Sequence, residues 1–159
     1  TIFTKECPID IMNVYNPMKN IKKEEFIHFY SQIENKSLIA GDFNAHHSIF
    51  NSQSTNNTTG INLVQFLQDY PDVALASPKN LQTYHDWSRN YHSTLDLCLV
   101  SSDLLPLTDV ICLDPCGSDH SPVKITVALS PEVAQLRRRP RWVFSEEGWK
   151  KWKTKMKDW

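Results

Sequence analysis

The stretch SLIAGDFNAHHS, residues 37–48, begins as an apolar strand and continues with an acid, an amide and two imidazoles. Residues two apart in an extended segment face the same way, so we expect Asp42 and Asn44 to project together while Phe43 turns toward the core. A carboxylate can orient a water molecule or bind Mg²⁺, and an amide can donate to a phosphate oxygen. A simple Gly-Asp turn after a strand also accounts for these residues. Polar groups further along the chain decide between the two interpretations.

The stretch TLDLCLV, residues 94–100, places a carboxylate inside a strongly apolar strand. Both faces of this predicted strand are otherwise apolar, and a buried ionised carboxylate without a partner is strongly destabilising. We therefore expect Asp96 to cap a neighbouring loop or to hold a cation or an imidazole. A carboxylate that only accepts backbone donors is the structural alternative.

A third polar group, GSDH at residues 117–120, precedes another apolar segment. It supplies a flexible glycine, a hydroxyl, an acid and an imidazole, which can all face one ligand. A loop histidine is often only solvated. Asp119 and His120 together with the carboxylate of Asp96, however, offer an imidazole whose charge is controlled by acids.

Helical and strand periodicities alternate around these three groups. The pattern predicts helices over residues 21–33 and 61–70, and strands over residues 9–15, 38–40, 73–75, 95–100, 110–113 and 123–129. A loop rich in Asn, Ser and Thr precedes the second helix, and residues 83–94 form a polar stretch. The alternation indicates an α/β or α+β layered domain.

Composition indicates a globular domain with a core, because 40% of the 159 residues are hydrophobic and 22% are charged. No segment has the roughly 18 consecutive apolar residues of a membrane span, and no secretory pattern precedes the first strand. We expect a soluble, intracellular protein without a membrane partner. The chain opens at Thr1 and reaches a strand almost at once, so we interpret it as a fragment.

The cysteine spacing and the distribution of charge along the chain give two further predictions. The four cysteines form no CxxC pair, so we expect reduced thiols rather than a zinc site. Residues 1–129 hold 8 Lys or Arg against 14 Asp or Glu, whereas residues 130–159 hold 9 against 4. We therefore predict a domain over 1–129, followed by a basic, Trp-rich linker and helix over 130–159.

The predicted C-terminal helix, residues 145–159, carries Trp149, Trp152, Met156 and Trp159 on one stripe and lysines on its remaining surface. The indoles suit packing against a domain. The lysines suit a nucleic-acid backbone, and the whole helix also suits a membrane surface or a calmodulin-like partner.

The ordered motifs NVYNP, GDFNAHH, STLDLCLVSS and GSDHSPV resemble those of the endonuclease/exonuclease/phosphatase superfamily. Within it, NAHH and the Trp-rich segment after GSDHSPV are similar to the apurinic-type endonuclease domain of non-LTR retrotransposons. The resemblance covers residues 10–129, and RPRWVFSEEGWKKW resembles the start of a linker toward a reverse transcriptase. It implies a four-layered α/β sandwich, truncated at its N-terminus, with the active site at strand ends between two packed sheets.

The resemblance also implies an activity, namely Mg²⁺-dependent nicking of DNA in the nucleus. Asp42 would position the attacking water, Asn44 would contact the phosphate, and Tyr15 would support the scissile group. The same resemblance links the chain to DNA as a substrate and to a reverse transcriptase domain in the full-length protein.

The remaining implied roles concern charge and metal. Asp96 would orient His120, and His120 would stabilise the charge that develops on phosphorus. Asp119 would be a ligand of a Mg²⁺ or Mn²⁺ ion, shared with Asp42 and Asn44.

The chain also departs from the family, whose first half supplies an early Asn and a metal-binding Glu. The residues before Tyr15 offer no counterpart, so we expect impaired activity, and an open strand edge that favours self-association. Two alternatives stay open. One is a catalytically inactive relic that acts as a binding module, and the other is a phosphatase or phosphodiesterase of the same superfamily.

Five further residues are weaker candidates. His46 and His47 could contact DNA or lie beside a metal, although adjacent imidazoles on a loop are usually solvated. Thr83, Tyr84 and His85 lie in a stretch that the family uses near DNA.

Overall fold

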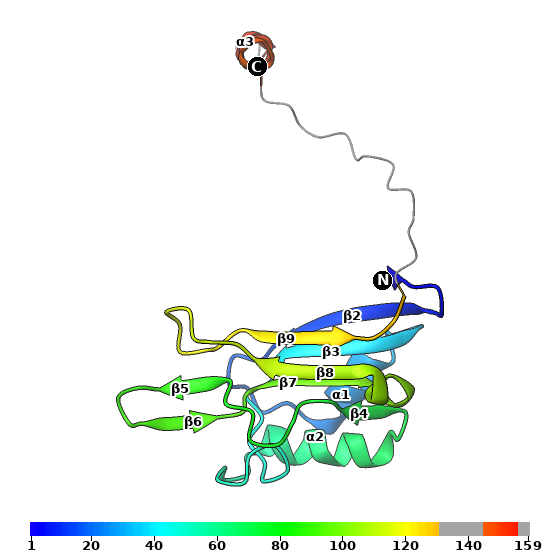
Figure 1. Cartoon of the computed structure of the whole chain (residues 1–159), viewed down its shortest axis with the longest axis vertical. Helices are drawn as coiled ribbons and strands as arrows, with labels where there is room; N and C mark the ends of the chain where they lie inside the picture. Colours follow the sequence, from blue (N-terminus) through cyan, green and yellow to red (C-terminus); the bar gives the residue numbers. More distant parts are fainter. Residues whose placement is uncertain (131–144, 156–159) are drawn as a thin grey trace.

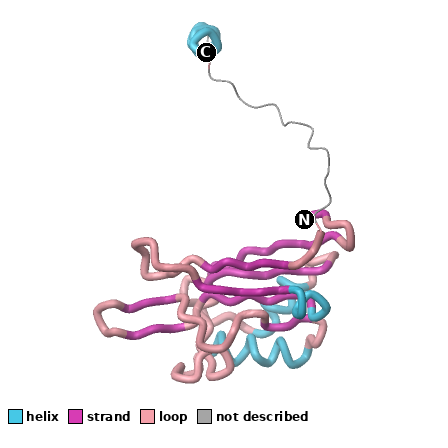
Figure 2. The backbone as a smooth tube through the Cα atoms, in the orientation of Figure 1, coloured by secondary structure: helices cyan, strands magenta, loops and turns pink. Residues whose placement is uncertain are grey.

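The computed structural model describes residues 1–130 and 145–155, and it has sheets and helices in an α/β arrangement (Figures 1 and 2). Its strands are β1 (Ile2–Phe3), β2 (Pro8–Tyr15), β3 (Lys36–Asp42), β4 (Val73–Leu75), β5 (Tyr84–Asp86), β6 (Tyr91–Ser93), β7 (Asp96–Ser101), β8 (Thr108–Cys112) and β9 (Val123–Val127). Its helices are α1 (Lys23–Tyr30), α2 (Thr58–Asp69), α3 (Glu146–Lys155) and a 3₁₀ helix, η1 (Ser102–Leu107). The predicted α/β class is confirmed.

The central sheet has the strand order β1-β2-β3-β7-β4. β2 is parallel to β3, whereas β7 is antiparallel to both β3 and β4. Leu97 and Leu99 of β7 pack on one face of the sheet, and Cys98 and Val100 pack on the other. A strand with apolar side chains on both faces belongs inside a sheet that is covered on both sides. β7 is therefore an inner strand, and Asp96 lies at its first position.

The helices α1 and α2 cover one face of the central sheet (Figure 1). Phe26 of α1 lies between Phe43, just after β3, and Phe66 of α2, with ring centroids 6.5 and 6.0 Å apart. All three rings are buried, and aromatic side chains of this size dominate the energetics of a small core. The aromatic cluster fixes the segment after β3 against both helices.

A second, two-stranded antiparallel sheet, β8 and β9, packs on the opposite face of the central sheet. Ile9, Leu38 and Val100 of the central sheet form a buried cluster with Val110 of β8, and Ile125 of β9 packs against it. The described residues thus form a helix layer, a five-stranded sheet and a two-stranded sheet. The predicted packing of two sheets is present, with helices outside the central sheet, and the described residues form three of the four predicted layers.

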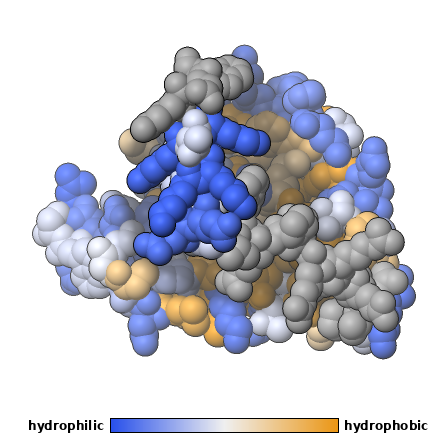
Figure 3. Space-filling model, turned by 90° about the horizontal axis from the view of Figure 1, so that it is seen from above, coloured by the Kyte–Doolittle hydropathy of each residue, from blue (hydrophilic) through white to orange (hydrophobic). Residues whose placement is uncertain are grey.

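Hydrophobic residues are open to solvent on the face seen from above in Figure 3. Ile2, Phe3 and Ile11 are 52%, 63% and 51% exposed. An apolar groove, here called the β2–β9 groove, is lined by Ile2, Thr4, Ile9, Ile11, Leu38, Val127 and Leu129. Among the described residues β9 pairs only with β8, so its other edge is unpaired.

Several predicted boundaries were wrong. The first helix covers residues 23–30 rather than 21–33. The second helix begins at Thr58 rather than at residue 61, because Asn57 caps it by accepting the Gly60 N–H at 2.7 Å. The polar stretch 83–94 contains an antiparallel hairpin, β5–β6, which projects from the sheets (Figure 1).

The predicted C-terminal helix is present as α3, in which Trp149 and Trp152 are partly exposed and meet edge to face at 5.4 Å. Met156 and Trp159 of the predicted stripe, and the predicted linker over residues 131–144, lie outside the described residues. No helix of the described ranges is long and apolar enough to cross a bilayer.

Candidate active site

Polar side chains from three neighbouring strands lie side by side at one end of the central sheet. β2 ends at Tyr15 and β3 ends at Asp42, and the sheet register pairs these two residues. β7 runs the opposite way and begins at Asp96, which is paired with Asp42. Like charges directly opposite each other on neighbouring strands are destabilising. The paired carboxylates of Asp42 and Asp96 therefore need hydrogen-bond donors or a positive charge nearby.

The chain after β3 turns sharply, so that Asp42 and Asn44 contact each other. Asp42 accepts the backbone N–H of Asn44 at 3.0 Å and the side-chain amide of Asn44 at 3.1 Å. The same amide donates to the carbonyl of Asn16 at 2.7 Å. Asn44 has a φ of 45°, a left-handed conformation that asparagine tolerates better than most residues. The expected pair is present, but a turn produces it rather than the extended segment that we predicted.

Asp96 holds the imidazole of His120, with 2.8 Å between Oδ2 and Nδ1. An ionised carboxylate can only accept, so Nδ1 carries the proton and donates it. The hydroxyl of Thr83 accepts the backbone N–H of Asp96 at 2.9 Å, and the Tyr84 ring packs against His120 at 5.2 Å. The sequence predicted that Asp96 caps a loop or holds a cation or an imidazole, and in the structure it holds the imidazole of His120.

A cavity of about 470 Å³ brings these groups together. It is lined by Tyr15, Pro17, Met18, Asp42, Asn44, His46, Tyr84, Leu95, Asp119 and His120. All of the predicted site residues except Asp96 line the cavity, and Asp96 contacts it through His120. The structure thus gathers the predicted residues around one space, while their individual roles stay predictions.

The cavity concentrates negative charge. Burial raises the pKa of the Asp42 carboxyl above its ordinary value, and the charges of Asp96 and Asp119 raise this pKa further. The Asn44 N–H and His120 act in the opposite direction. Burial also lowers the pKa of His46, against the attraction of Asp42. A cation bound among these carboxylates would relieve the repulsion that raises the Asp42 pKa.

The donor atoms of the site suit a hard divalent cation. The carboxylates of Asp42 and Asp119 and the amide oxygen of Asn44 are the ligand type that Mg²⁺ and Mn²⁺ prefer. No group of three or more His, Cys, Asp or Glu side chains within residues 1–130 and 145–155 is arranged to hold a metal ion. Mg²⁺ usually takes only one or two protein carboxylates and keeps water and substrate phosphate as its other ligands. The residues fit such an ion as part of its shell, and they do not form a closed metal site.

The weaker candidates occupy different positions. His46 lines the cavity, whereas His47 accepts the Ile49 N–H at 3.2 Å and packs near Phe50 with ring centroids 5.9 Å apart. His85 is buried in the hairpin and hydrogen-bonds other side chains through both ring nitrogens. The structure therefore separates the two adjacent histidines, because His46 lines the cavity and His47 does not, and of the other weaker candidates Tyr84 also lines it.

Two asparagines that the sequence interpretation passed over hold the site in place. Asn57 donates to the carbonyl of Asn44 at 2.8 Å and accepts the N–H of His46 at 3.0 Å. Asn16 is buried and donates to the carbonyl of Phe43 at 2.9 Å. Asparagine just before an apolar helical pattern is an N-cap signal, and this signal could have identified Asn57.

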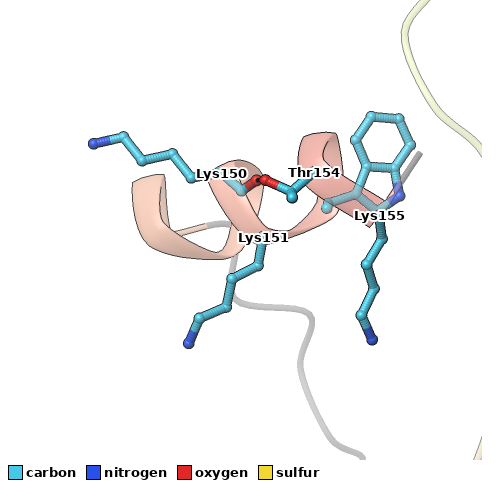
Figure 4. Close-up of a pocket in the computed structure, with 5 residues that line it drawn as sticks. Lys150, Lys151, Thr154 and Lys155 are labelled. Atoms are coloured by element: carbon cyan, nitrogen blue, oxygen red, sulfur yellow. Dashed lines mark hydrogen bonds between the residues drawn. The ribbon is translucent and has the colours of Figure 1, made fainter. Parts of the chain in front are cut away.

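Neither the cysteines nor α3 provides another candidate site in the described part of the chain. All four cysteines are free, and burial raises the pKa of the Cys98 thiol to about 12, which makes it unreactive. A hollow on α3 is lined by Lys150, Lys151, Trp152, Thr154 and Lys155. Figure 4 shows its labelled lysines pointing away from this one helix, so they do not converge on a ligand.

A family model described as endonuclease-reverse transcriptase matches residues 9–124, which include every residue of the cavity. No curated protein matches the chain.

Solved structures share the fold, and two of them illustrate the match. The endonuclease domain of TRAS1, a telomere-specific non-LTR retrotransposon, is 20% identical with a TM-score of 0.60, over 72% of this chain and 55% of that chain. The catalytic domain of Xenopus laevis APE2 is 22% identical with a TM-score of 0.56, over 84% of this chain and 55% of that chain. The chain thus spans about half the length of each. The predicted fold and the predicted family resemblance are both confirmed.

Proposed function

We propose, from the premise that the chain belongs to the endonuclease-reverse transcriptase family of the endonuclease/exonuclease/phosphatase superfamily, that its cavity hydrolyses phosphodiester bonds of DNA. The observation that carries the proposal is the Asp96–His120 hydrogen bond of 2.8 Å, beside Asp42 and Asn44 in one cavity. A carboxylate-oriented imidazole next to a second carboxylate and an amide is a set that can position water and stabilise charge on a phosphate.

In the proposed reaction, a water molecule positioned by Asp42 attacks phosphorus in line with the leaving oxygen. The bond between phosphorus and the 3′ oxygen breaks, the attacking water releases a proton, and the leaving 3′ oxygen takes one up, so the products are a 3′-hydroxyl and a 5′-phosphate. Asp96 accepts the Nδ1 proton of His120, and in the imidazolium form of the ring the Nε2–H donates to the phosphate oxygens, where charge develops. Asn44 supports the phosphate through its side chain, and Tyr15 stands at the rim beside the scissile group.

The residues that would hold a Mg²⁺ or Mn²⁺ ion are Asp119, Asp42 and Asn44. The ion, when bound, supplies positive charge that offsets the charge of the phosphate. This chain's own contribution is to gather these oxygen atoms at the cavity, and to hold Asn44 in its turn through Asn16 and Asn57.

We expect activity to be impaired in this chain on its own. Among the residues before Tyr15, the carboxylates are Glu6 and Asp10, and neither lines the cavity. Asp10 instead accepts hydrogen bonds from Thr1 and Asn35, near the opposite end of β2 from Tyr15. A carboxylate ligand from another part of a longer protein would complete the site.

The same premise suggests partners and a location. DNA is the proposed substrate, a reverse transcriptase domain is the proposed continuation of the protein, and the nucleus is the proposed place of action. In this proposal residues 130–159 link the endonuclease domain, residues 1–129, to that continuation, and the lysines of α3 lie close to nucleic acid.

Plasmid nicking tests the proposal, with the protein translated from the complete reading frame that encodes this chain. We expect conversion of supercoiled to nicked circles in Mg²⁺, and loss of this activity in Asp42→Ala and in His120→Ala. Asp109→Ala removes an exposed carboxylate of β8 outside the cavity and should leave nicking unchanged. Equal nicking by all the variants would refute the assigned roles.

A substrate comparison separates the proposal from its closest alternative within the superfamily. The protein should cleave duplex DNA faster than a soluble phosphomonoester. The reverse preference would indicate a phosphatase, and binding of DNA without any cleavage would indicate a binding module.

A further inference from the structure

His46 is an imidazole in the cavity to which the proposed reaction gives no part. It lines the same cavity as Asp42, Asn44 and His120, and its side chain is half-buried there. Its backbone follows Asn44 by two residues, so the side chain stands next to the proposed position of the phosphate.

The backbone of His46 is fixed from both sides. Its N–H donates to the side-chain oxygen of Asn57 at 3.0 Å, and its carbonyl accepts the backbone N–H of Asn57 at 3.0 Å. Gly60 of α2 packs so closely that a Cβ atom there would lie 2.0 Å from the His46 carbonyl oxygen. The fold thus fixes the backbone from which the His46 side chain reaches the cavity.

The ring nitrogens of His46 differ from those of His47 and His85 in their hydrogen bonding. Both ring nitrogens of His85 bond to neighbouring side chains, and one ring nitrogen of His47 accepts the Ile49 N–H. No hydrogen bond between residues of the described ranges uses a ring nitrogen of His46. These nitrogens are not among the buried side-chain atoms that lack a partner, so water reaches them in the cavity, and a ligand oxygen can take the place of that water.

We propose that His46 is a DNA-contacting residue, which donates a hydrogen bond from its imidazole to a phosphate oxygen of the bound strand. This rests on the proposed function of the cavity. A neutral imidazole carries one N–H donor, so the contact requires no change of charge. The two adjacent histidines then have different roles, since His46 binds substrate in the cavity, whereas His47 lies outside the cavity and accepts the Ile49 N–H.

Binding of a short fluorescent DNA duplex in EDTA tests the inference, because no cleavage complicates the measurement. We expect His46→Leu to raise the dissociation constant about tenfold, as loss of one hydrogen bond to a charged group implies. His46→Gln keeps a side-chain donor and should stay within about threefold of the unsubstituted protein. The matched control is His47→Leu, the same change at the adjacent residue, and it should leave DNA affinity unchanged.

Nicking kinetics of the same variants distinguish this inference from the proposed function. His46→Leu should raise KM and change kcat little, because the contact helps to bind the strand rather than to break the bond. Unchanged affinity in folded His46→Leu, or an equal loss in His47→Leu, would overturn the inference even if the protein nicks DNA. Absence of nicking in the unsubstituted protein would instead overturn the proposed function, while the affinities would still report on His46. If His46→Leu does not fold, His46→Ala repeats the test without added bulk.

Discussion

Asp42 is held where its charge is unfavourable, and this has a measurable consequence for stability. Burial and the nearby carboxylates raise its pKa in the folded state. The folded protein therefore keeps this proton to a higher pH than the unfolded chain does, and the fold loses stability as pH rises through the interval between the two pKa values. A side chain that costs stability at neutral pH is retained for a reason other than folding, which agrees with a catalytic role.

We predict that Asp42→Asn raises the thermal unfolding midpoint at neutral pH while it abolishes nicking. Asparagine carries no charge and keeps an oxygen for the Asn44 N–H, and it gives up only the second bond, from the Asn44 side-chain amide. The difference in midpoint should vanish well below about pH 3.9, the pKa of an ordinary aspartate, because the residue is then neutral in both states. Calorimetry across this pH range measures the difference in midpoint. A lower midpoint for Asp42→Asn at neutral pH would contradict the idea that burial and the nearby carboxylates make the Asp42 charge unfavourable.

Asp10 provides a control of opposite sign for this measurement. Its hydrogen bond with Thr1, together with those from Asn35 and Glu34, lowers its pKa. Its contribution is therefore present above the ordinary aspartate pKa and is lost as pH falls. Asp10→Asn should lower the unfolding midpoint at neutral pH, and this effect too should vanish in acid.

Individual site residues could be predicted where a polar residue interrupts an otherwise apolar strand. Asp96 interrupts an apolar strand, so a partner could be inferred, although its identity could not, since His120 lies 24 residues further on. Asn16 and Asn57 were missed because they bond to backbone atoms of a loop far away in the sequence. Local patterns describe neighbours along the chain, and these contacts form only when the strands are assembled.

The N-terminus of α2 couples the helix to the site through Asn57. The side-chain oxygen of Asn57 accepts from Gly60 and His46, whereas its nitrogen donates to the carbonyl of Asn44. Asn57→Asp keeps the acceptors and an equally good N-cap, but it places a carboxylate oxygen against the Asn44 carbonyl. The helix and the active-site turn can thus be perturbed separately.

We predict that Asn57→Asp keeps the free energy of unfolding within about 1 kcal/mol of the unsubstituted value and lowers kcat for nicking about tenfold or more. Asn57→Ala should lower both quantities, because it removes the cap as well. Denaturant unfolding and nicking assays on the same preparations give the two values. Full activity in Asn57→Asp would mean that the Asn44 turn does not depend on the hydrogen bond from the Asn57 side chain to the Asn44 carbonyl.

The pairing of β2 with β3 depends on Gly41. A Cβ atom at this position would lie 1.9 Å from the carbonyl oxygen of Val14, and φ is 143°. We predict that Gly41→Ala destabilises the protein by about 4 kcal/mol or more, or prevents folding, because backbone atoms cannot yield as a flexible side chain can. Gly117→Ala is the control, since its φ is 89° but nothing lies within 4 Å of the added atom. It should cost only about 1–2 kcal/mol in a urea titration. Equal effects would show that strain, and not crowding, determines both.

Elements with strong periodicity were predictable, and elements defined by pairing were not. The central strands and α2 followed from their apolar patterns, with errors of a few residues at their ends. The hairpin β5–β6 was missed because its polar residues do not alternate with apolar ones. Its buried members are the polar residues His85 and Ser93, and the carbonyl of Ser93 accepts the backbone N–H of Thr83, just before β5. Such backbone pairing leaves no hydrophobic signal in the sequence.

At the scale of the whole molecule, the β2–β9 groove is open among the described residues, 1–130 and 145–155. Ile11 lies in this groove and is 51% exposed, and one edge of β9 is unpaired among the described residues. Exposed apolar surface beside an open strand edge favours association. We propose that a second copy of this chain covers the groove when the chain is studied alone.

We predict that this chain sediments as a concentration-dependent dimer and that Ile11→Lys shifts it to monomer. A lysine would leave its charge without a partner in an apolar interface, which is strongly unfavourable. Ile61→Lys is the matched control, because Ile61 is also exposed, at 41%, but lies on α2 away from the groove. Sedimentation of a monomer at all concentrations, or equal effects of the two substitutions, would rule out the groove as the contact.

The central claim is that side chains from β2, β3, β7 and the loop before β9 act as one phosphodiester-cleaving site. The most direct test is the plasmid-nicking rate of Asp96→Ala, of His120→Ala and of the double variant, each in the protein from the complete reading frame. Each single change should lower the rate by about 10²–10⁴-fold, and the double variant should be no slower than the slower single by more than about threefold, because Asp96 acts through His120. Single effects that multiply in the double variant, or a nicking rate that none of the three changes, would contradict the account.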